Sequence, residues 1–528
     1  MRAPGAGRGP GPWPAPFRFP QPRSRIVTAH QAGTSPQTPP GSGGAAKPVI
    51  ETRSIDYVPL AERHGKVWHL FPVWFAGDAH LATIATGAIG VALGGNLIWT
   101  AIAVVLGGAF GTFFMAFHST QGPQLGLPQM VQSRPQFGYV GALLVWVVAL
   151  TTYIGYTAFN QILIAQTMHH LAGTPAGVSY VGYAAVAIVL AVVGYDVIHR
   201  ASRWLTFLVI AVLAVFSVGV VAADPFSPAQ LDLGSFALAP FLVQFFTAAV
   251  YQMSWSIYVS DYSRYLPPTV GVRSSFWWTY LGAWVGGAWM MLIGTVAAGL
   301  FPKAELVDSV ISAGDELFPG FGVTLLLVSV LPLISIGTLN FYGGSLTLLS
   351  SMDSVRKIRP TLGKRVAALL VLGVLSTVIA FGSDKAFLTD FGHFLTVLGY
   401  LFTPWTAINL VDFYVVRRGH YSIREIFNPR GMYGRWSGRG LLAYGIGFLS
   451  MLPFAEVGGF RGPGAALVGG ADVTMLIGLP VSAGVYLLAC RGMDLAAERA
   501  AVAAADAGLE DGVPGGEAAP VSGTAPAR

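Results

Sequence analysis

Two ionisable side chains stand inside a segment that is otherwise apolar. Asp78 and His80 lie in FPVWFAGDAHLATIATGAIG, residues 71–90, where almost every neighbour is hydrocarbon or glycine. A charge in the middle of a membrane helix costs about 2.5–3.5 kcal/mol on insertion scales, so such residues are usually functional. Three roles for Asp78 are open: a proton-coupling carboxylate, an acceptor for ligand N–H groups, or a protonated structural acid. His80 is interpreted mainly as a packing residue, although it could share the hydrogen-bond network of Asp78.

Two further apolar segments contain polar and aromatic residues in their interiors. In TTYIGYTAFNQ, Tyr156 and Asn160 are four residues apart and therefore share one face of a helix. In VYQMSWSIYVSDYSRY, Trp255 stands between Ser254 and Ser256. Because polar groups inside membrane helices are costly, these residues are the candidates for binding chemistry.

Broken helices are the third feature that points to an internal site. Gly77 precedes Asp78, where a helix could unwind, and PLISIGTLNFYGG places Asn340 in an apolar run close to Pro332 and Gly337. Interrupted helices are tolerated at membrane depth where they line a cavity or pack on protein. We therefore expect these segments to face the inside of the molecule.

The elements that position these residues follow from composition. The chain has 528 residues, of which 53% are hydrophobic and 11% charged, and its mean hydropathy is +0.60. Soluble domains carry about 25% charged residues, so a lipid-facing exterior is expected. The single cysteine, Cys490, excludes a disulfide framework and a cysteine-based metal cluster.

Twelve hydrophobic segments are long enough to suggest a bundle of transmembrane helices. We predict disordered cytoplasmic tails at residues 1–52 and 493–528. Between them, residues 53–492 are predicted to form a domain of twelve helices. Crossing a bilayer takes about 20 residues as a helix. The expected spans are 71–96, 98–117, 138–171, 180–197, 203–222, 237–258, 274–300, 322–350, 364–381, 387–415, 440–457 and 472–490.

The basic residues of the connections predict the orientation. Nineteen Lys and Arg residues fall on the side of both termini, and only Lys303, Lys385 and Arg461 fall on the opposite side. This bias predicts a multi-pass protein of the cell (inner) membrane with both termini in the cytoplasm. It also accounts for the net charge of +6 without nucleic acid as a partner. The lipid bilayer is the expected partner, and the oligomeric state is left open.

Several classes of polytopic protein fit this outline. An enzyme would need a nucleophile–base pair or a metal site, and the helices contain no HExxH, GxSxG or paired-carboxylate motif. We therefore expect no catalytic residues, no metal site and no cofactor. The classes that stay open are a transporter, a passive channel and a sensor for small polar solutes. The glycine-rich stretches GAIGVALGG and LGGAFG are interpreted as helix-packing surfaces.

Four stretches in order along the chain resemble the nucleobase–cation symporter family of the purine–cytosine permease type. They are GLPQMVQSRPQFGYVG (126–141), IGYTAFNQILIAQ (154–166), SWSIYVSDYSRYLP (254–267) and FLTVLGYLFTPWTAINLVDFYVVRRGHYSI (394–423). The resemblance covers residues 55–490 approximately. It implies an all-α fold of twelve helices, in which a five-plus-five inverted repeat of the leucine-transporter kind is followed by two peripheral helices. It also implies import of a nucleobase or related planar heterocycle together with a cation.

The resemblance assigns roles to individual residues. The family stacks its substrate between aromatic residues on helices 3 and 6, which correspond here to Tyr156 and Trp255, with Ser254 and Ser256 beside the tryptophan. The tyrosine is a departure, since many relatives have tryptophan there. Stacking on a base is worth about 1–3 kcal/mol and tolerates many rings.

Selectivity is therefore expected from the amides that match the family, Asn160 and Asn340. Helix 1 departs further, because many relatives have asparagines where this chain has Asp78 and His80. The substrate could be cytosine, a purine, allantoin or a similar ring, or a compound outside the nucleobases.

The coupling ion is a proton or sodium. In this fold sodium lies between helix 1 carbonyls and helix 8 hydroxyls, for which Ser335 and Thr338 are the candidates here. The adjacent hydroxyl pair of sodium-dependent relatives is missing, and Asp78 is a possible proton carrier. Asp78 and His80 are therefore included with Ser335 and Thr338 as candidate ion-coupling residues.

Overall fold

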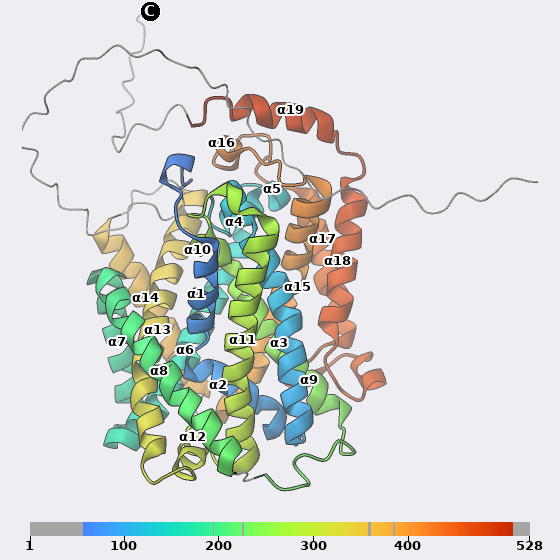
Figure 1. The fold of residues 1–528 in the computed structure, drawn as a ribbon. Coiled ribbons are helices and arrows are strands. Elements are labelled where there is room, and N and C mark those ends of the chain that lie inside the picture. Colours follow the sequence, from blue (N-terminus) through green and yellow to red (C-terminus); the bar gives the residue numbers. More distant parts are fainter. Residues whose placement is uncertain (1–55, 194, 224–225, 357–360, 384–385, 511–528) are drawn as a thin grey trace, which may run out of the picture. The chain divides into compact units, whose positions relative to one another are not determined.

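The computed structural model describes residues 56–510 except 194, 224–225, 357–360 and 384–385 (Figure 1). The chain divides into two units, Met1–Val49 and Ile50–Arg528, and the first unit lies outside the described residues together with the whole tail predicted at 1–52. The long helices of the second unit are α3 (Leu97–Ser119), α6 (Leu143–Ala172), α7 (Ala176–Val193), α8 (Tyr195–Ala223), α9 (Leu238–Ser254), α11 (Gly271–Leu300), α13 (Phe321–Val355), α14 (Leu362–Ser383), α15 (Phe387–Val411), α17 (Gly438–Met451) and α18 (Thr474–Cys490).

Shorter elements interrupt or connect these helices. The short α-helices are α1 (Leu70–Gly77), α2 (Leu81–Ala92), α4 (Gln121–Leu125), α5 (Arg134–Phe137), α10 (Val259–Ser263), α12 (Leu306–Asp315), α16 (Ile423–Ile426) and α19 (Leu495–Ala505). A π-helical turn, Asp412–Val416, follows α15, and a two-residue hairpin pairs β1 (Glu456–Val457) with β2 (Phe460–Arg461). Figure 1 shows α16 and α19 at one end of the bundle and α12 at the other, and we call these the α19 end and the α12 end.

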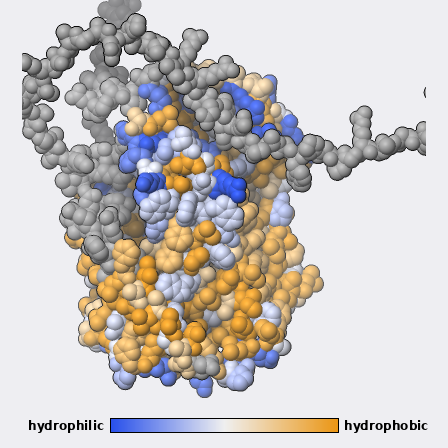
Figure 2. Space-filling model, in the orientation of Figure 1, coloured by the Kyte–Doolittle hydropathy of each residue, from blue (hydrophilic) through white to orange (hydrophobic). Residues whose placement is uncertain are grey.

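The helices match the predicted hydrophobic segments. Each of the twelve segments coincides with one helix or with a broken pair of helices. In the described part of the chain, six helices are long and apolar enough to cross a membrane, namely α3, α6, α11, α13, α14 and α15, and a seventh span results if α18 and α19 are counted together. Figure 2 shows a broad apolar surface with hydrophilic residues gathered towards the ends. The chain is therefore a multi-pass membrane protein.

Helices 1 and 6 of the predicted bundle are both broken in mid-course. α1 ends at Gly77, and α2 begins at Leu81 after His80, whose backbone is extended (φ −153°, ψ 166°). α9 ends at Ser254, passes through a 3₁₀ turn at Trp255–Ile257, and resumes as α10. The break predicted beside Gly77 is confirmed, and these two breaks place polar backbone and side chains inside the bundle.

Glycines allow the helices around these breaks to pack at backbone distance. A Cβ atom on Gly87 would lie 1.8 Å from the Met291 carbonyl oxygen, and one on Gly294 would lie 1.8 Å from that of Ile84. The same holds for Gly111 of α3, whose Cβ would lie 1.9 Å from the carbonyl oxygen of Ala249. The interpretation of the glycine-rich stretches as packing surfaces is confirmed, because small residues let membrane helices approach closely.

The C-terminal segment differs from its prediction. Residues 493–528 were expected to be disordered, yet α19 forms at Leu495–Ala505, and residues 511–528 lie outside the described part. The Asp494 side chain caps this helix by accepting from the backbone N–H groups of Ala496 and Ala497. The prediction is wrong here because the alanine-rich composition that suggested disorder also has the highest helix propensity.

Side-chain contacts attach α19 to the connection after α15. Glu498 accepts from Arg417 Nε at 2.6 Å, and Asp506 accepts from Ser422 Oγ at 2.8 Å and from the backbone N–H of Ile423 at 2.8 Å. Tertiary contacts of charged groups therefore stabilise a helix that is too short to be stable alone.

Candidate functional site

Asp78 lies in the break of helix 1 with its carboxylate only partly satisfied. It is 1% exposed, and its Oδ2 accepts one hydrogen bond, from Gln252 Nε2 at 3.2 Å. Its Oδ1 has no hydrogen-bond partner among the described residues. The same Gln252 nitrogen donates to the Ala283 carbonyl oxygen at 3.2 Å. Gly287 of α11 leaves the room for this amide, because a Cβ there would lie 1.6 Å from Gln252 Nε2.

His80 contacts a tyrosine of helix 6. Its Nε2 lies 3.4 Å from the Tyr251 hydroxyl, which lies 2.6 Å from the Thr83 hydroxyl. Its Nδ1 has no partner within the described part of the chain. The link of His80 to Asp78 is through the backbone, where the His80 N–H donates to the Asp78 carbonyl oxygen at 2.8 Å. The side chains of Asp78 and His80 therefore have different hydrogen-bond partners.

Tyr156 and Trp255 lie on either side of Tyr251. The Tyr156 ring meets the edge of Tyr251 at 5.8 Å between centroids, and Trp255 meets it at 6.4 Å. The Tyr156 hydroxyl is hydrogen-bonded to Ser254 Oγ at 2.9 Å, whereas Ser256 Oγ is buried without a partner among the described residues. The structure thus brings the predicted helix 3 and helix 6 aromatic residues into contact with one tyrosine, Tyr251.

The two predicted amides occupy different surroundings. Asn160 is hydrogen-bonded to the hydroxyl of Tyr183, which donates to the Leu333 carbonyl oxygen at 2.7 Å. Asn340 is 5% exposed and lines a cavity. Asn160 Oδ1 and Asn340 Nδ2 lack hydrogen-bond partners in the described part of the protein. Each amide therefore keeps one group available for a ligand.

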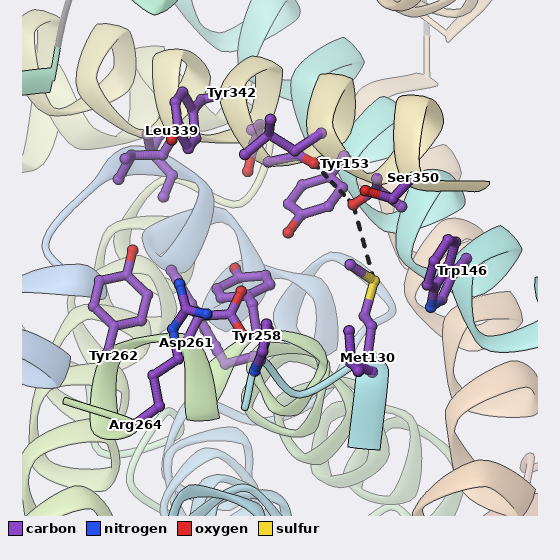
Figure 3. A pocket seen from close by; sticks show the side chains of 18 of the residues that line it. Met130, Trp146, Tyr153, Tyr258, Asp261, Tyr262, Arg264, Leu339, Tyr342 and Ser350 are labelled. Carbon is purple, nitrogen blue, oxygen red and sulfur yellow. Dashed lines mark hydrogen bonds between the residues drawn. The ribbon is translucent and has the colours of Figure 1, made fainter. Parts of the chain in front are cut away.

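A cavity of about 270 Å³ extends from Trp255 and Asn340 towards the α19 end. It follows α13 from Ile336 to Ser350, a rise of about 21 Å at 1.5 Å per residue. Figure 3 shows Leu339, Tyr342 and Ser350 on the α13 wall, with Tyr258, Tyr262 and Arg264 on the opposite wall. Its walls combine aromatic rings with a few polar groups, which is the usual composition of a small-molecule site. We call it the inner cavity.

Sequence analysis missed two tyrosines of the inner cavity. Tyr153 and Tyr258 line it, and their rings are stacked at 5.8 Å between centroids and 17° between planes. Tyr153 precedes Tyr156 by three residues, a spacing that places both near one helix face and could have signalled it. Tyr156, Asn160 and Asp78 are not among the residues that line this cavity.

Asp261 and Arg264, the charged residues that follow the break in helix 6, also line the inner cavity. Asp261 Oδ1 accepts from the Gln129 backbone N–H at 2.9 Å, and Arg264 Nη1 donates to the Asp56 carbonyl oxygen at 3.2 Å. These contacts join α10 to the connection between α4 and α5 and to the segment before α1.

The two helix 8 hydroxyls do not line the inner cavity. Thr338 Oγ1 donates to the carbonyl oxygen of Ile334 in its own helix at 2.8 Å, and neither Ser335 nor Thr338 is among the residues lining the inner cavity. No group of three or more His, Cys, Asp or Glu side chains suited to a metal occurs within the described residues. The Asp78 carboxylate is therefore hydrogen-bonded to neither Ser335 nor Thr338.

Several buried polar atoms near the broken helices lack hydrogen-bond partners among the described residues. Unpartnered buried acceptors come from Asp78, Gln252 and Asn160, and unpartnered buried N–H donors come from Trp74, Trp255 and Asn340. Buried polar groups are nearly always hydrogen-bonded, so these atoms are candidates for contacts with a ligand or with water. A flat ring with alternating N–H and carbonyl groups has the matching chemistry.

Comparisons with known proteins agree with this chemistry. A family model described as permease for cytosine/purines, uracil, thiamine, allantoin matches residues 57–478. The putative purine-cytosine permease YxlA of Bacillus subtilis is 35% identical over 445 residues, which are 83% of this chain and 95% of that protein. The purine-cytosine permease fcyB of Emericella nidulans is 26% identical over 463 residues, covering 84% of this chain and 89% of that one.

The fold has a counterpart among solved structures. Mhp1, a nucleobase-cation-symport-1 family transporter in a closed conformation with bromovinylhydantoin bound, superposes with a TM-score of 0.67. The sequences are 16% identical, and the match covers 88% of this chain and 99% of Mhp1. Since both the family model and the Bacillus relative span most of the chain, this protein belongs to the family of permeases for cytosine/purines, uracil, thiamine and allantoin.

Proposed function

We propose that this protein imports a nucleobase or a related planar heterocycle by cation symport. The observation that carries the proposal is the inner cavity, which is lined by Trp255 from the break in helix 6 and by Asn340 from α13. Discontinuous helices that line a cavity are the feature by which secondary transporters bind substrate near the membrane midplane. The relatives named purine-cytosine permease support the substrate class.

The arrangement in the membrane is part of the same proposal. We propose twelve spans in a five-plus-five inverted repeat followed by two peripheral helices, in the inner membrane, with both termini in the cytoplasm. The breaks in helices 1 and 6, the first members of the two halves, support the repeat. The α19 end would then be cytoplasmic, and the inner cavity would open towards the cytoplasm.

We propose a proton as the coupling ion and Asp78 as its carrier. The buried Asp78 carboxylate has one hydrogen-bond donor and one unpartnered oxygen, so a proton on Oδ1 would find no competing donor among the described residues. Sodium at Ser335 and Thr338 is the alternative, and the internal bond of Thr338 to Ile334 argues against it.

Uptake into proteoliposomes tests the function. We expect accumulation of at least one of radiolabelled cytosine, hypoxanthine or allantoin above equilibrium when a proton gradient is imposed. Uptake should fall strongly in Trp255→Ala and in Asn340→Ala. Equilibration without accumulation would identify a channel, and binding without flux would identify a sensor. Intact uptake in both variants would remove these residues from the site.

A further inference from the structure

A second cavity, of about 260 Å³, lies on the far side of the broken helices from the inner cavity. Its walls are formed by the end of α2, the middle of α9, the first half of α15, and the segment from the end of α17 to the start of α18. Its hydrophobic lining includes Phe246, Val250 and Leu388. We call it the outer cavity, because α9 and α15 both run from the α12 end towards the breaks.

Three polar side chains of the outer cavity have no hydrogen-bond partner among the described residues. They are the hydroxyls of Thr247 and Thr389 and the imidazole of His393. Thr247 is 5% exposed as a residue, His393 is half-buried and Thr389 is exposed, so the three side chains lie at different depths in the cavity wall. An apolar cavity with a small number of polar groups in its wall is the general form of a small-molecule site.

The carboxylates at the rim of the outer cavity have a different character. Glu456 is paired with Arg461 at 2.6 Å. Asp472 accepts hydrogen bonds from the Thr474 hydroxyl at 2.6 Å and from the Tyr400 hydroxyl. These acids are satisfied by the protein and shape the rim, which leaves the threonines and the histidine as the groups open to a ligand.

A layer of aromatic side chains separates the two cavities. Val250 lines the outer cavity and Trp255 lines the inner one, five residues further along the same broken helix. Between them Tyr251 meets Tyr156, whose ring in turn meets the edge of Phe394 at 5.2 Å. Because this layer is packed, a molecule in one cavity does not occupy the other.

We propose that the outer cavity is a second binding subsite for the same class of ligand, a small planar heterocycle with N–H and carbonyl groups on its edge. The Phe246 ring supplies apolar contact, and Thr247, Thr389 and His393 supply hydrogen bonds to the edge. The proposal rests on the proposed function for its ligand class. It adds that two ligands bind at once, one on each side of the aromatic layer.

Site-directed alkylation tests the outer subsite separately from transport. Cys490 is the single cysteine, so Cys490→Ser provides a background without thiols. Leu93→Cys places a reporter in the outer cavity at a position that is 52% exposed, and Leu467→Cys, at 85% exposure, is the matched reporter outside the cavity. The probes are cytosine, hypoxanthine and allantoin, and the readout is the rate of maleimide labelling.

We expect at least one probe to slow labelling of Leu93→Cys fivefold or more and to leave Leu467→Cys unchanged. The protection should persist when Trp255→Ala is added, and it should be lost when Thr247→Val or His393→Ala is added. Thr247→Val keeps the shape of the side chain, so a folding defect of His393→Ala would not obscure the result.

Two results would overturn the subsite. One is protection that disappears with Trp255→Ala, because it would then arise from the inner cavity. The other is absence of protection by every probe, whether or not the probes are transported. Protection by a probe, when none of the three probes is taken up, would instead retain the subsite and refute the proposed function.

Discussion

Two buried aspartates show how differently the same residue type is used in this protein. Asp412 is fully buried and accepts four hydrogen bonds, from Arg417 Nη1 (2.7 Å), Tyr486 Oη (2.9 Å), Gln136 Nε2 (2.9 Å) and Tyr421 Oη (2.5 Å). Asp78 is 1% exposed and accepts one side-chain hydrogen bond at 3.2 Å. A carboxylate whose oxygens are all hydrogen-bonded holds elements together, whereas a partly satisfied one can still accept a hydrogen bond from a ligand.

Removing the satisfied carboxylate should have the largest effect. Asp412→Ala takes away the partner of a guanidinium that is itself buried, and breaking a buried pair from one side costs about 3–5 kcal/mol. Equilibrium unfolding in mixed micelles should show this loss of free energy, with Asp78→Asn as the control that changes stability little. Equal destabilisation by the two variants would show that Asp412 and Asp78 do not differ in their contribution to stability.

Removing the aromatic surface of the inner cavity should weaken ligand binding and leave the stability of the fold largely unchanged. Trp255→Ala removes stacking that is worth about 1–3 kcal/mol per base, which corresponds to a rise of about 5- to 150-fold in KM. Kinetics of uptake for the best probe would measure it. Trp277→Ala, which removes a tryptophan that is 47% exposed on α11, is the control and should leave KM unchanged.

Neutralising the partly satisfied carboxylate should uncouple transport. A pH difference of one unit is worth about 1.4 kcal/mol and supports about tenfold accumulation by symport with one proton. Asp78→Asn should equilibrate the probe without accumulating it, while exchange of labelled for unlabelled probe across the membrane continues. Concentrative uptake equal to that of the parent protein would exclude Asp78 as the proton carrier.

Gln252 is the only side-chain donor to Asp78 among the described residues, and crowding it should sharpen the comparison further. Gly287→Ala places a methyl group where the Gln252 amide lies, and overpacking of this kind costs about 1–3 kcal/mol unless a neighbour is shortened. Uptake should fall in Gly287→Ala and recover in part when Gln252→Ala is added. A double variant that is no better than the single one would show that Gly287 acts through other contacts.

The smallest effect should come from the helix attached to the satisfied cluster. Glu498→Gln keeps the shape of the side chain and weakens its charged hydrogen bond to Arg417, at a cost of about 1 kcal/mol. α19 should then detach more often, and tryptic cleavage after Arg499 should become about fivefold faster. Glu316→Gln, an exposed change at the α12 end, should leave the cleavage rate unchanged.

Much of the site was accessible from residue types and spacing. Trp255 and Asn340, chosen as polar or aromatic residues inside apolar segments, line the inner cavity. Tyr156 and Asn160 share a helix face as expected. However, the Tyr156 ring packs against Tyr251, and the Asn160 amide is hydrogen-bonded to Tyr183. Those partners come from other helices, so no pattern within helix 3 could have identified them.

The amino-acid sequence by itself determined the class of protein, the apolar segments, the break beside Gly77 and the family. These follow from local properties, because hydropathy, glycine and short motifs act within one helix or one turn. Only the tertiary structure decided that α19 is ordered, that Gln252 is the partner of Asp78, and that Asp412 is saturated while Asp78 is not. Hydrogen-bond satisfaction depends on groups brought together from distant parts of the chain, and packing alone selects them.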